Sequence, residues 1–275
     1  MSDDRSAIVT PTIYREYILK HFPTTVSSEY KPVDFIIGVA SENYTPTGGT
    51  GDFHPNWSLT TFSPEKLKNL KENYPQVRFV ISFGGVGTQY PFKSYEKQQW
   101  ITSAVISIKD IIHLYDDNNQ KNLIDGIDIH YDSIESSPDD FSYCIGEVIN
   151  KLKTDLSIKS VSIAPTEHNQ SHYKKLYSDN QDNIDFVGYL FTNQTYSSVE
   201  KVVHVFEKLV ADYSPFKVLP GFLYPSFSDV IIKEAIIFLI NHKLATGFFT
   251  YPADHDSPVG PPGPFSFKEY ASKST

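Results

Sequence analysis

Eight short apolar runs alternate with amphipathic segments along the chain, and this alternation constrains the fold more strongly than any other feature. Each run is rich in β-branched or aromatic residues and is bounded by Gly, Pro, Asn or Asp, which is typical of a β-strand. The predicted strands are Ile13–Leu19, Phe35–Ala40, Phe79–Phe83, Leu123–His130, Ser160–Ala164, Phe186–Phe191, Val218–Phe222 and Gly247–Thr250. The chain therefore alternates strand and helix throughout.

The segments between these runs carry apolar residues at helical spacing. Ser63-Pro64-Glu65 predicts a helix start, because serine caps a helix and proline suits its first turn. Further helices are predicted from Ser94 to Ile112 and over Phe141–Leu156, Val199–Tyr213, Asp229–His242 and Phe265–Ala271. Eight strand–helix units favour an α/β fold, a single (β/α)8 TIM barrel, because such barrels run to about 250 residues as one domain. We therefore expect one domain over residues 1–275.

Charge and cysteine content exclude several classes of partner. The chain has 24 basic and 33 acidic residues, a net charge of −9 and a pI near 5.4. Nucleic acids and anionic membranes need a basic stripe, so we expect neither as a partner. The single cysteine, Cys144, excludes an intrachain disulfide, and the N-terminal residues lack the apolar stretch of a signal peptide. These features predict a reduced, cytoplasmic protein, which we expect to be a monomer without a cofactor.

Polar residues follow several predicted strands at their C-terminal ends. They are Ser41, Glu42, Asp132, Glu167, His168 and Asn193. The functional groups of a TIM barrel lie at this face, where the loops that follow the strands meet. The sequence therefore predicts a polar pocket at the C-terminal face.

The segment Asp125–Asp132 concentrates ionisable residues on one predicted strand. Side chains alternate along a strand, so Asp128, His130 and Asp132 point to one face. Such groups are costly on an apolar strand unless they pair with one another or serve a function. A zinc site would need a more distant ligand, for which His168 is the obvious candidate. We favour mutual neutralisation of His130 and Asp132 and expect no metal.

The motif Asp125-Gly-Ile-Asp128-Ile-His130-Tyr-Asp132 resembles the signature of glycoside hydrolase family 18, Asp-Gly-x-Asp-x-Asp-x-Glu, at the end of the fourth strand. Further matches are Ser82-Phe-Gly84-Gly85 on the third strand, Ala164-Pro165 ending the fifth and Phe191-Thr-Asn193 ending the sixth. Within the family, the chain is most similar to the narbonin-like seed globulins and to the legume RuBisCO-associated proteins. The resemblance implies a TIM barrel without disulfides and without demonstrated chitinase activity.

The resemblance also implies a reaction, and this chain departs from the family at its main positions. Asp132 replaces the glutamate that donates a proton, and His130 replaces the aspartate that holds the substrate acetamide. Thr192 stands where the family has a tyrosine, while Asp125 and Asp128 remain as supporting residues. A general acid must lie within about 2.6–3.2 Å of its oxygen, and aspartate is one methylene short. We therefore expect no hydrolysis.

Three functions stay open. The first is a catalytically inactive chitinase-like plant protein with a seed-storage role or a protein partner. The second is a lectin-like binder of chitooligosaccharides or related N-acetylglucosamine glycans, and the third is a residual family 18 glycosidase. The predicted sugar cleft is lined by Ser82, Gly84, Gly85, Asp132, Asn193 and Tyr251, the last in place of a family tryptophan. The candidate stacking aromatics, most of which we expect to pack internally, are Tyr44, Trp57, Tyr90, Tyr196, Tyr224 and Tyr251.

Overall fold

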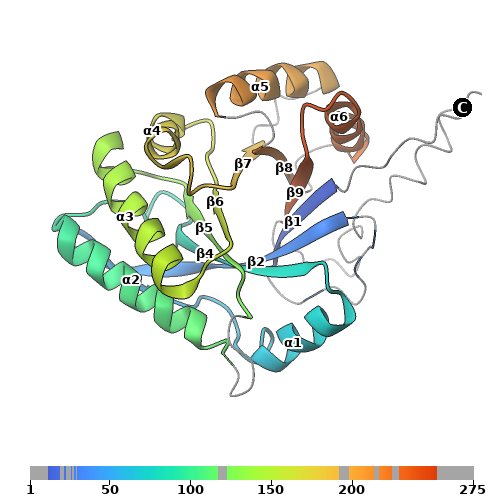
Figure 1. The fold of residues 1–275 in the computed structure, drawn as a ribbon. Helices are drawn as coiled ribbons and strands as arrows, with labels where there is room; N and C mark the ends of the chain where they lie inside the picture. The colour runs from blue at the N-terminus through green and yellow to red at the C-terminus, as the bar shows by residue number, and fades with distance from the viewer. Residues whose placement is uncertain are drawn as a thin grey trace, which may run out of the picture.

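The eight predicted strands form a closed parallel barrel in the computed structural model (Figure 1). The structure describes residues 12–18, 22, 26, 28, 30–116, 123–191, 198–213, 217–224 and 229–252. The strands are β1 Thr12–Ile18, β2 Tyr30–Thr45, β4 Val77–Gly85, β5 Gly126–Tyr131, β6 Ser160–Ile163, β7 Phe186–Phe191, β8 Val218–Tyr224 and β9 Gly247–Pro252. They neighbour one another in the order β1-β9-β8-β7-β6-β5-β4-β2, and parallel pairing of β1 with β2 closes the ring. The predicted TIM barrel is confirmed.

From β3 onward a helix lies between each strand and the next, and these helices lie outside the barrel in Figure 1. They are α1 Pro64–Asn73, α2 Lys97–His113, α3 Pro138–Leu156, α4 Gln170–Asn180, α5 Val199–Asp212 and α6 Asp229–Asn241. The predicted start of α1 is confirmed, because the Ser63 side chain accepts a hydrogen bond from the Lys66 backbone N–H at 3.4 Å. Within the described ranges, no helix has the length and apolar character needed to cross a membrane.

The structure corrects several predicted boundaries. The structure adds a strand, β3 (Gly48–His54), between the second and third predicted strands. It pairs antiparallel with β2 and is held to α2 by a hydrogen bond from the Phe53 N–H to Ser107. The helix predicted from Ser94 begins at Lys97, and α3 begins earlier than predicted, capped by Ser137. Helix α4 was not predicted, and the predicted helix 265–271 lies outside the described residues.

The barrel interior is apolar in its middle and charged at its N-terminal end. The apolar layer contains Tyr17, Ile36, Val80, Leu190, Leu219 and Phe249. Two residues earlier on β1, β2 and β4, Arg15, Asp34 and Arg78 occupy paired positions. The Asp34 carboxylate accepts the Arg15 Nε–H at 2.9 Å and the Arg78 Nε–H at 2.7 Å. This ion triad fills the N-terminal end, so a ligand would enter from the opposite, C-terminal face.

Candidate functional site

Asp128 lies at the centre of a hydrogen-bonded cluster inside the barrel. Its carboxylate accepts hydrogen bonds from Tyr17 Oη on β1 at 2.5 Å, from Ser82 Oγ on β4 at 2.9 Å and from Ser162 Oγ on β6. Three hydroxyl donors from three different strands suit a carboxylate, which only accepts. Asp128 is 1% exposed, so the cluster is a fixed internal support.

His130 extends this cluster toward the C-terminal face. Its Nδ1 lies 3.4 Å from Tyr17 Oη, and its Nε2 lies 3.2 Å from Asp132 Oδ1. Tyr17 also donates its hydroxyl hydrogen to Asp128, and Asp132 Oδ1 belongs to a carboxylate, which can only accept. His130 therefore lies between the Tyr17 hydroxyl and the Asp132 carboxylate, and the predicted inward-facing His130–Asp132 pair is present.

Asp132 is the most accessible member of the cluster, with its side chain 33% exposed. Its Oδ2 accepts the Gly87 backbone N–H at 2.8 Å, so each carboxylate oxygen already has a donor. Burial raises the pKa of Asp132, but the hydrogen bond and charge of His130, together with the Gly87 N–H, outweigh burial and lower it overall. The group is therefore ionised at neutral pH, which is the wrong state for a proton donor.

The lowered pKa predicts how acid changes stability. Because the folded-state pKa lies below its ordinary value of 3.8, Asp132 contributes stability above 3.8 and loses it as the pH falls through the folded pKa. Thermal unfolding of the wild type and of Asp132→Asn should therefore differ most near neutral pH, and the difference should shrink toward about pH 3. A difference that stays constant over this range would contradict the assigned ion pair.

Asp125 does not join this cluster, although the signature motif contains it. It precedes β5, at the N-terminal end of the barrel, and its Oδ2 accepts the Phe79 backbone N–H at 2.9 Å. The same oxygen lies 2.6 Å from Lys71 Nζ on α1. Asp125 therefore fixes α1 and β4 to the start of β5, far along the strand from the C-terminal face.

Glu42 also departs from its predicted place in the polar ring. Its side chain is buried outside the barrel, where Oε1 accepts Trp100 Nε1–H at 2.5 Å and the Gly51 N–H at 2.8 Å. Oε2 accepts Tyr131 Oη–H at 2.9 Å. Burial raises the pKa of Glu42, and the Gly51, Trp100 and Tyr131 donors oppose that rise. Glu42 therefore joins the β2–β3 hairpin to α2 and is not part of the predicted polar ring. The sequence analysis did not predict its contacts with Gly51, Trp100 and Tyr131.

Glycines close the space around the cluster. Gly84 has a φ of +151°, and a Cβ there would meet the His130 carbonyl oxygen at 1.9 Å. A Cβ on Gly85 would meet the Tyr90 carbonyl oxygen at the same distance. Only glycine lets β4 approach β5 and the following loop this closely. Ser82 and both glycines therefore hold the strand ends together around Asp132.

The remaining predicted site residues fall outside this cluster or outside the described side chains. Thr192 and Asn193 lie outside the described residues, and Tyr251 belongs to β9, where its side chain is not described. Glu167 and His168 are exposed in the turn before α4. Within the described ranges, no group of three or more His, Cys, Asp or Glu side chains is arranged to hold a metal ion.

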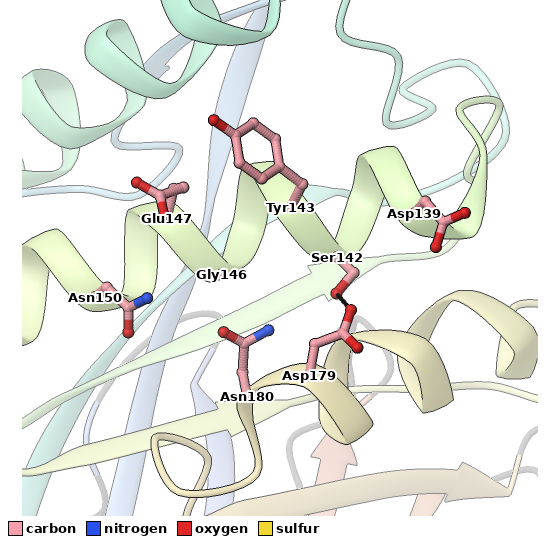
Figure 2. Close-up of a pocket in the computed structure, with 8 residues that line it drawn as sticks. All are labelled: Asp139, Ser142, Tyr143, Gly146, Glu147, Asn150, Asp179 and Asn180. Atoms are coloured by element: carbon pink, nitrogen blue, oxygen red, sulfur yellow. Dashed lines mark hydrogen bonds between the residues drawn. The ribbon is translucent and has the colours of Figure 1, made fainter.

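A separate polar cavity of about 200 Å³ lies on the outer helices (Figure 2). It is lined by Asp139, Ser142, Tyr143, Gly146, Glu147, Asn150, Asp179 and Asn180. Gly146 permits the close approach of α4, because a Cβ there would meet the Asn180 amide at 2.7 Å. Ser142 Oγ–H donates to Asp179, which also pairs with Lys175 at 2.9 Å. The hydrogen bond between Ser142 and Asp179 joins α3 to α4, away from the strand ends.

Comparison with known proteins gives consistent matches. The model of glycosyl hydrolases family 18 matches residues 38–205. Chitinase 1 of Tulipa saxatilis subsp. bakeri is 31% identical over 230 residues, which cover 78% of this chain and 71% of the tulip protein. The RuBisCO-associated protein of Glycine max is 27% identical over 183 residues, which cover 63% of this chain and 62% of that protein. This chain therefore covers less than two thirds of the Glycine max protein.

Two solved plant structures have the same overall fold. The catalytic domain of a family GH18 chitinase from the fern Peteris ryukyuensis matches with a TM-score of 0.75 and 25% identity, over 90% of this chain and 94% of that domain. The family 18 chitinase of Crocus vernus matches with a TM-score of 0.74 and 25% identity, over 88% of this chain and 92% of that structure.

Proposed function

Because this chain belongs to glycosyl hydrolases family 18, we propose that it is a chitinase-like protein that no longer hydrolyses glycans and serves as a store of protein or as a binding partner. The family predicted from the strand-four motif is confirmed. One observation carries the loss of hydrolysis: Asp132 stands at the position of the proton-donating glutamate and is held as a carboxylate by His130 and Gly87.

Three properties of Asp132 oppose acid catalysis. Its side chain is one methylene shorter than that of glutamate, so its carboxyl reaches less far from the strand end. Both oxygens already accept hydrogen bonds, and the lowered pKa leaves no proton to transfer at neutral pH. Correctly placed proton transfer contributes about 10²–10⁴-fold to a rate, so its loss removes much of the reaction.

A hydrolysis assay tests this proposal. Purified protein incubated with a fluorogenic chitooligosaccharide should release no fluorophore above the buffer background. The single variant Asp132→Glu should also stay inactive, because His130 still occupies the acetamide position and Thr192 the tyrosine position. Release by the wild-type protein would refute the loss of hydrolysis, and release by the variant alone would show that one methylene accounts for it.

The non-enzymatic role has indirect support. The Glycine max relative carries a name that denotes association with another protein, which favours a protein partner for this chain as well. The acidic net charge of −9 favours solubility at high concentration, as a storage role requires. We propose a reduced, cytoplasmic monomer, in which Cys144 is a buried small apolar residue.

A lectin-like role is the second candidate, and an exposed tyrosine in the loop after β4 favours it. Tyr90, 45% exposed in the loop after β4, has its ring centroid 5.7 Å from that of Tyr44. Trp57, in contrast, donates to Tyr115 Oη at 2.6 Å and packs on the outer core. An exposed aromatic ring such as that of Tyr90 can stack on a sugar. Titration calorimetry with N-acetylglucosamine oligomers separates the roles, because a storage protein should give no binding heat at millimolar ligand.

A further inference from the structure

Two buried polar atoms at the N-terminal end of the barrel have no hydrogen-bond partner among the residues that the structure describes. They are Arg15 Nη2 on β1 and Ser160 Oγ on β6. Arg15 is 2% exposed and Ser160 is 1% exposed, so both side chains are removed from bulk solvent. Buried polar side chains in folded proteins are nearly always hydrogen-bonded. Two such atoms at one end of a barrel therefore point to a ligand that they bind together.

Strand alternation directs both side chains into the same part of the barrel interior. Ser162 and Tyr17, from opposite sides of the barrel, both donate to the Asp128 carboxylate. Side chains two positions apart on a strand share a face. Ser160 precedes Ser162 by two positions, and Arg15 precedes Tyr17 by two positions. Arg15 and Ser160 therefore both point inward, one step closer than the Asp128 cluster to the N-terminal end.

The same end of the barrel carries more positive than negative charge. Arg15 and Arg78 share one carboxylate, that of Asp34, which lies 2.9 Å from Arg15 Nε and 2.7 Å from Arg78 Nε. Arginine keeps its charge in proteins, so neither guanidinium becomes neutral. Asp125, a further carboxyl at this end, pairs with Lys71 on α1, outside the barrel, and offsets neither arginine. Two guanidiniums and one carboxylate leave an excess of about one positive charge.

The surroundings offset this excess only in part. The Phe186 ring centroid lies 5.3 Å from Arg15 Cζ and 5.9 Å from Arg78 Cζ, and an aromatic face attracts a cation without carrying a full negative charge. The Arg78 side chain is 27% exposed, so solvent reaches this end beside it. The ion triad closes the end to a sugar, but a single small ion can pass beside Arg78. A water molecule there would satisfy hydrogen bonds and leave the charge unbalanced, whereas an anion does both.

We propose that the N-terminal end of the barrel binds one small monovalent anion, a halide or a carboxylate such as formate, which accepts hydrogen bonds from Arg15 Nη2 and Ser160 Oγ. One negative charge balances the two arginines against Asp34. A guanidinium N–H and a hydroxyl are both donors, and a donor bonded to an anion makes a stronger hydrogen bond than one bonded to a neutral acceptor. The site lies at the opposite end of the barrel from Asp132, so it does not depend on the loss of hydrolysis or on a sugar-binding role.

Thermal unfolding in three salts tests the site. Sodium chloride and sodium formate are titrated separately, and sodium gluconate, whose anion is too large for a buried site, keeps the ionic strength constant. Binding to the folded state alone should raise the Tm by about 5 °C when the small anion stands about a hundredfold above its Kd. A rise with either anion supports the site and shows whether it takes a halide or a carboxylate. The same Tm in all three salts would overturn the proposal.

Ser160→Ala and its control Ser178→Ala locate the bound anion. Ser160 Oγ has no partner among the described residues, so its removal should leave the fold intact and weaken anion binding by about tenfold. The Tm rise should then need about ten times more anion. Ser178, exposed on α4, should leave the anion dependence unchanged. An anion dependence in Ser160→Ala equal to that of the wild type would contradict the site.

Arg78→Gln tests the role of the excess charge. It leaves Arg15 balanced by Asp34 alone, so the Tm should no longer respond to the small anions, and a full response would overturn the proposal. Because Arg78 also holds Asp34, crystals of the wild type soaked in sodium bromide provide a reading that does not need this variant to fold. Anomalous density should lie within hydrogen-bond distance of Arg15 Nη2 and Ser160 Oγ. No density there, at a bromide concentration that raises the Tm, would place the anion elsewhere and overturn the proposal.

Discussion

Asp34→Ala should lower the free energy of unfolding by about 3–5 kcal/mol, the range for removing one partner of a buried ion pair. Asp34 is fully buried between Arg15, which is 2% exposed, and Arg78, whose side chain is 27% exposed. Among the residues that the structure describes, Arg15 Nη2 has no hydrogen-bond partner and Asp34 is the acidic group paired with Arg15, so the variant would leave a buried guanidinium without this counter-charge. Urea denaturation of both proteins measures the difference.

Asp155→Ala provides the matched control for Asp34→Ala. Asp155 also pairs with a basic residue, Lys109, at 2.6 Å, but it is 42% exposed on the surface. Exposed pairs contribute about 0–1 kcal/mol, so this variant should stay close to the wild type. If Asp34→Ala cost no more than Asp155→Ala, the ion triad would not hold the N-terminal end of the barrel together.

Trp100→Ala should destabilise the fold by about 3–5 kcal/mol, as expected for a fully buried large aromatic residue. Trp100 packs edge-on against Phe92, at a centroid distance of 5.1 Å, and against Phe53, at 6.2 Å. Its Nε1–H also donates to the buried Glu42 carboxyl. The substitution therefore opens a cavity under α2. It also removes a hydrogen-bond donor from the Glu42 carboxyl, which is buried away from solvent.

Trp100→Phe separates the two contributions. It keeps most of the ring but removes the hydrogen bond to Glu42, and it should cost about 1–3 kcal/mol. Trp57→Phe is the control, because Trp57 is only partly buried and donates to a hydroxyl, Tyr115 Oη. Trp57→Phe should lower the free energy of unfolding by less than Trp100→Phe does. A stability of Trp100→Phe equal to that of the wild type would mean that Glu42 does not need this donor.

Strand periodicity was sufficient to predict the barrel, but two elements had no comparable signal. All eight barrel strands were found because apolar, β-branched runs bounded by turn residues are visible without tertiary contacts. Strand β3 contains Gly48, Gly49 and Gly51 and shows no alternation of apolar side chains. Helix α4 is mostly polar and buries only Tyr173, Leu176 and Tyr177, so its apolar stripe is too short to stand out.

The candidate site was predictable only along the strand that carries it. Alternation on β5 correctly placed Asp128, His130 and Asp132 on one face. Tyr17 could not be connected to them, because it reaches Asp128 across the barrel from a strand 111 positions away in sequence. The Gly87 N–H depends on the backbone path of a loop, which residue types do not specify. The hydrogen-bond partners that other strands and loops supply to Asp128 and Asp132 could therefore be identified only from the structure.

The central claim is that position 132 no longer delivers a proton to a glycosidic oxygen. Its most direct test is the rate of product release from a chitin hexamer, measured by mass spectrometry for the wild type and for Asp132→Ala side by side. Equal release at the uncatalysed background rate is the predicted result. Release by the wild type that disappears in Asp132→Ala would contradict the claim, because it would make Asp132 a working acid.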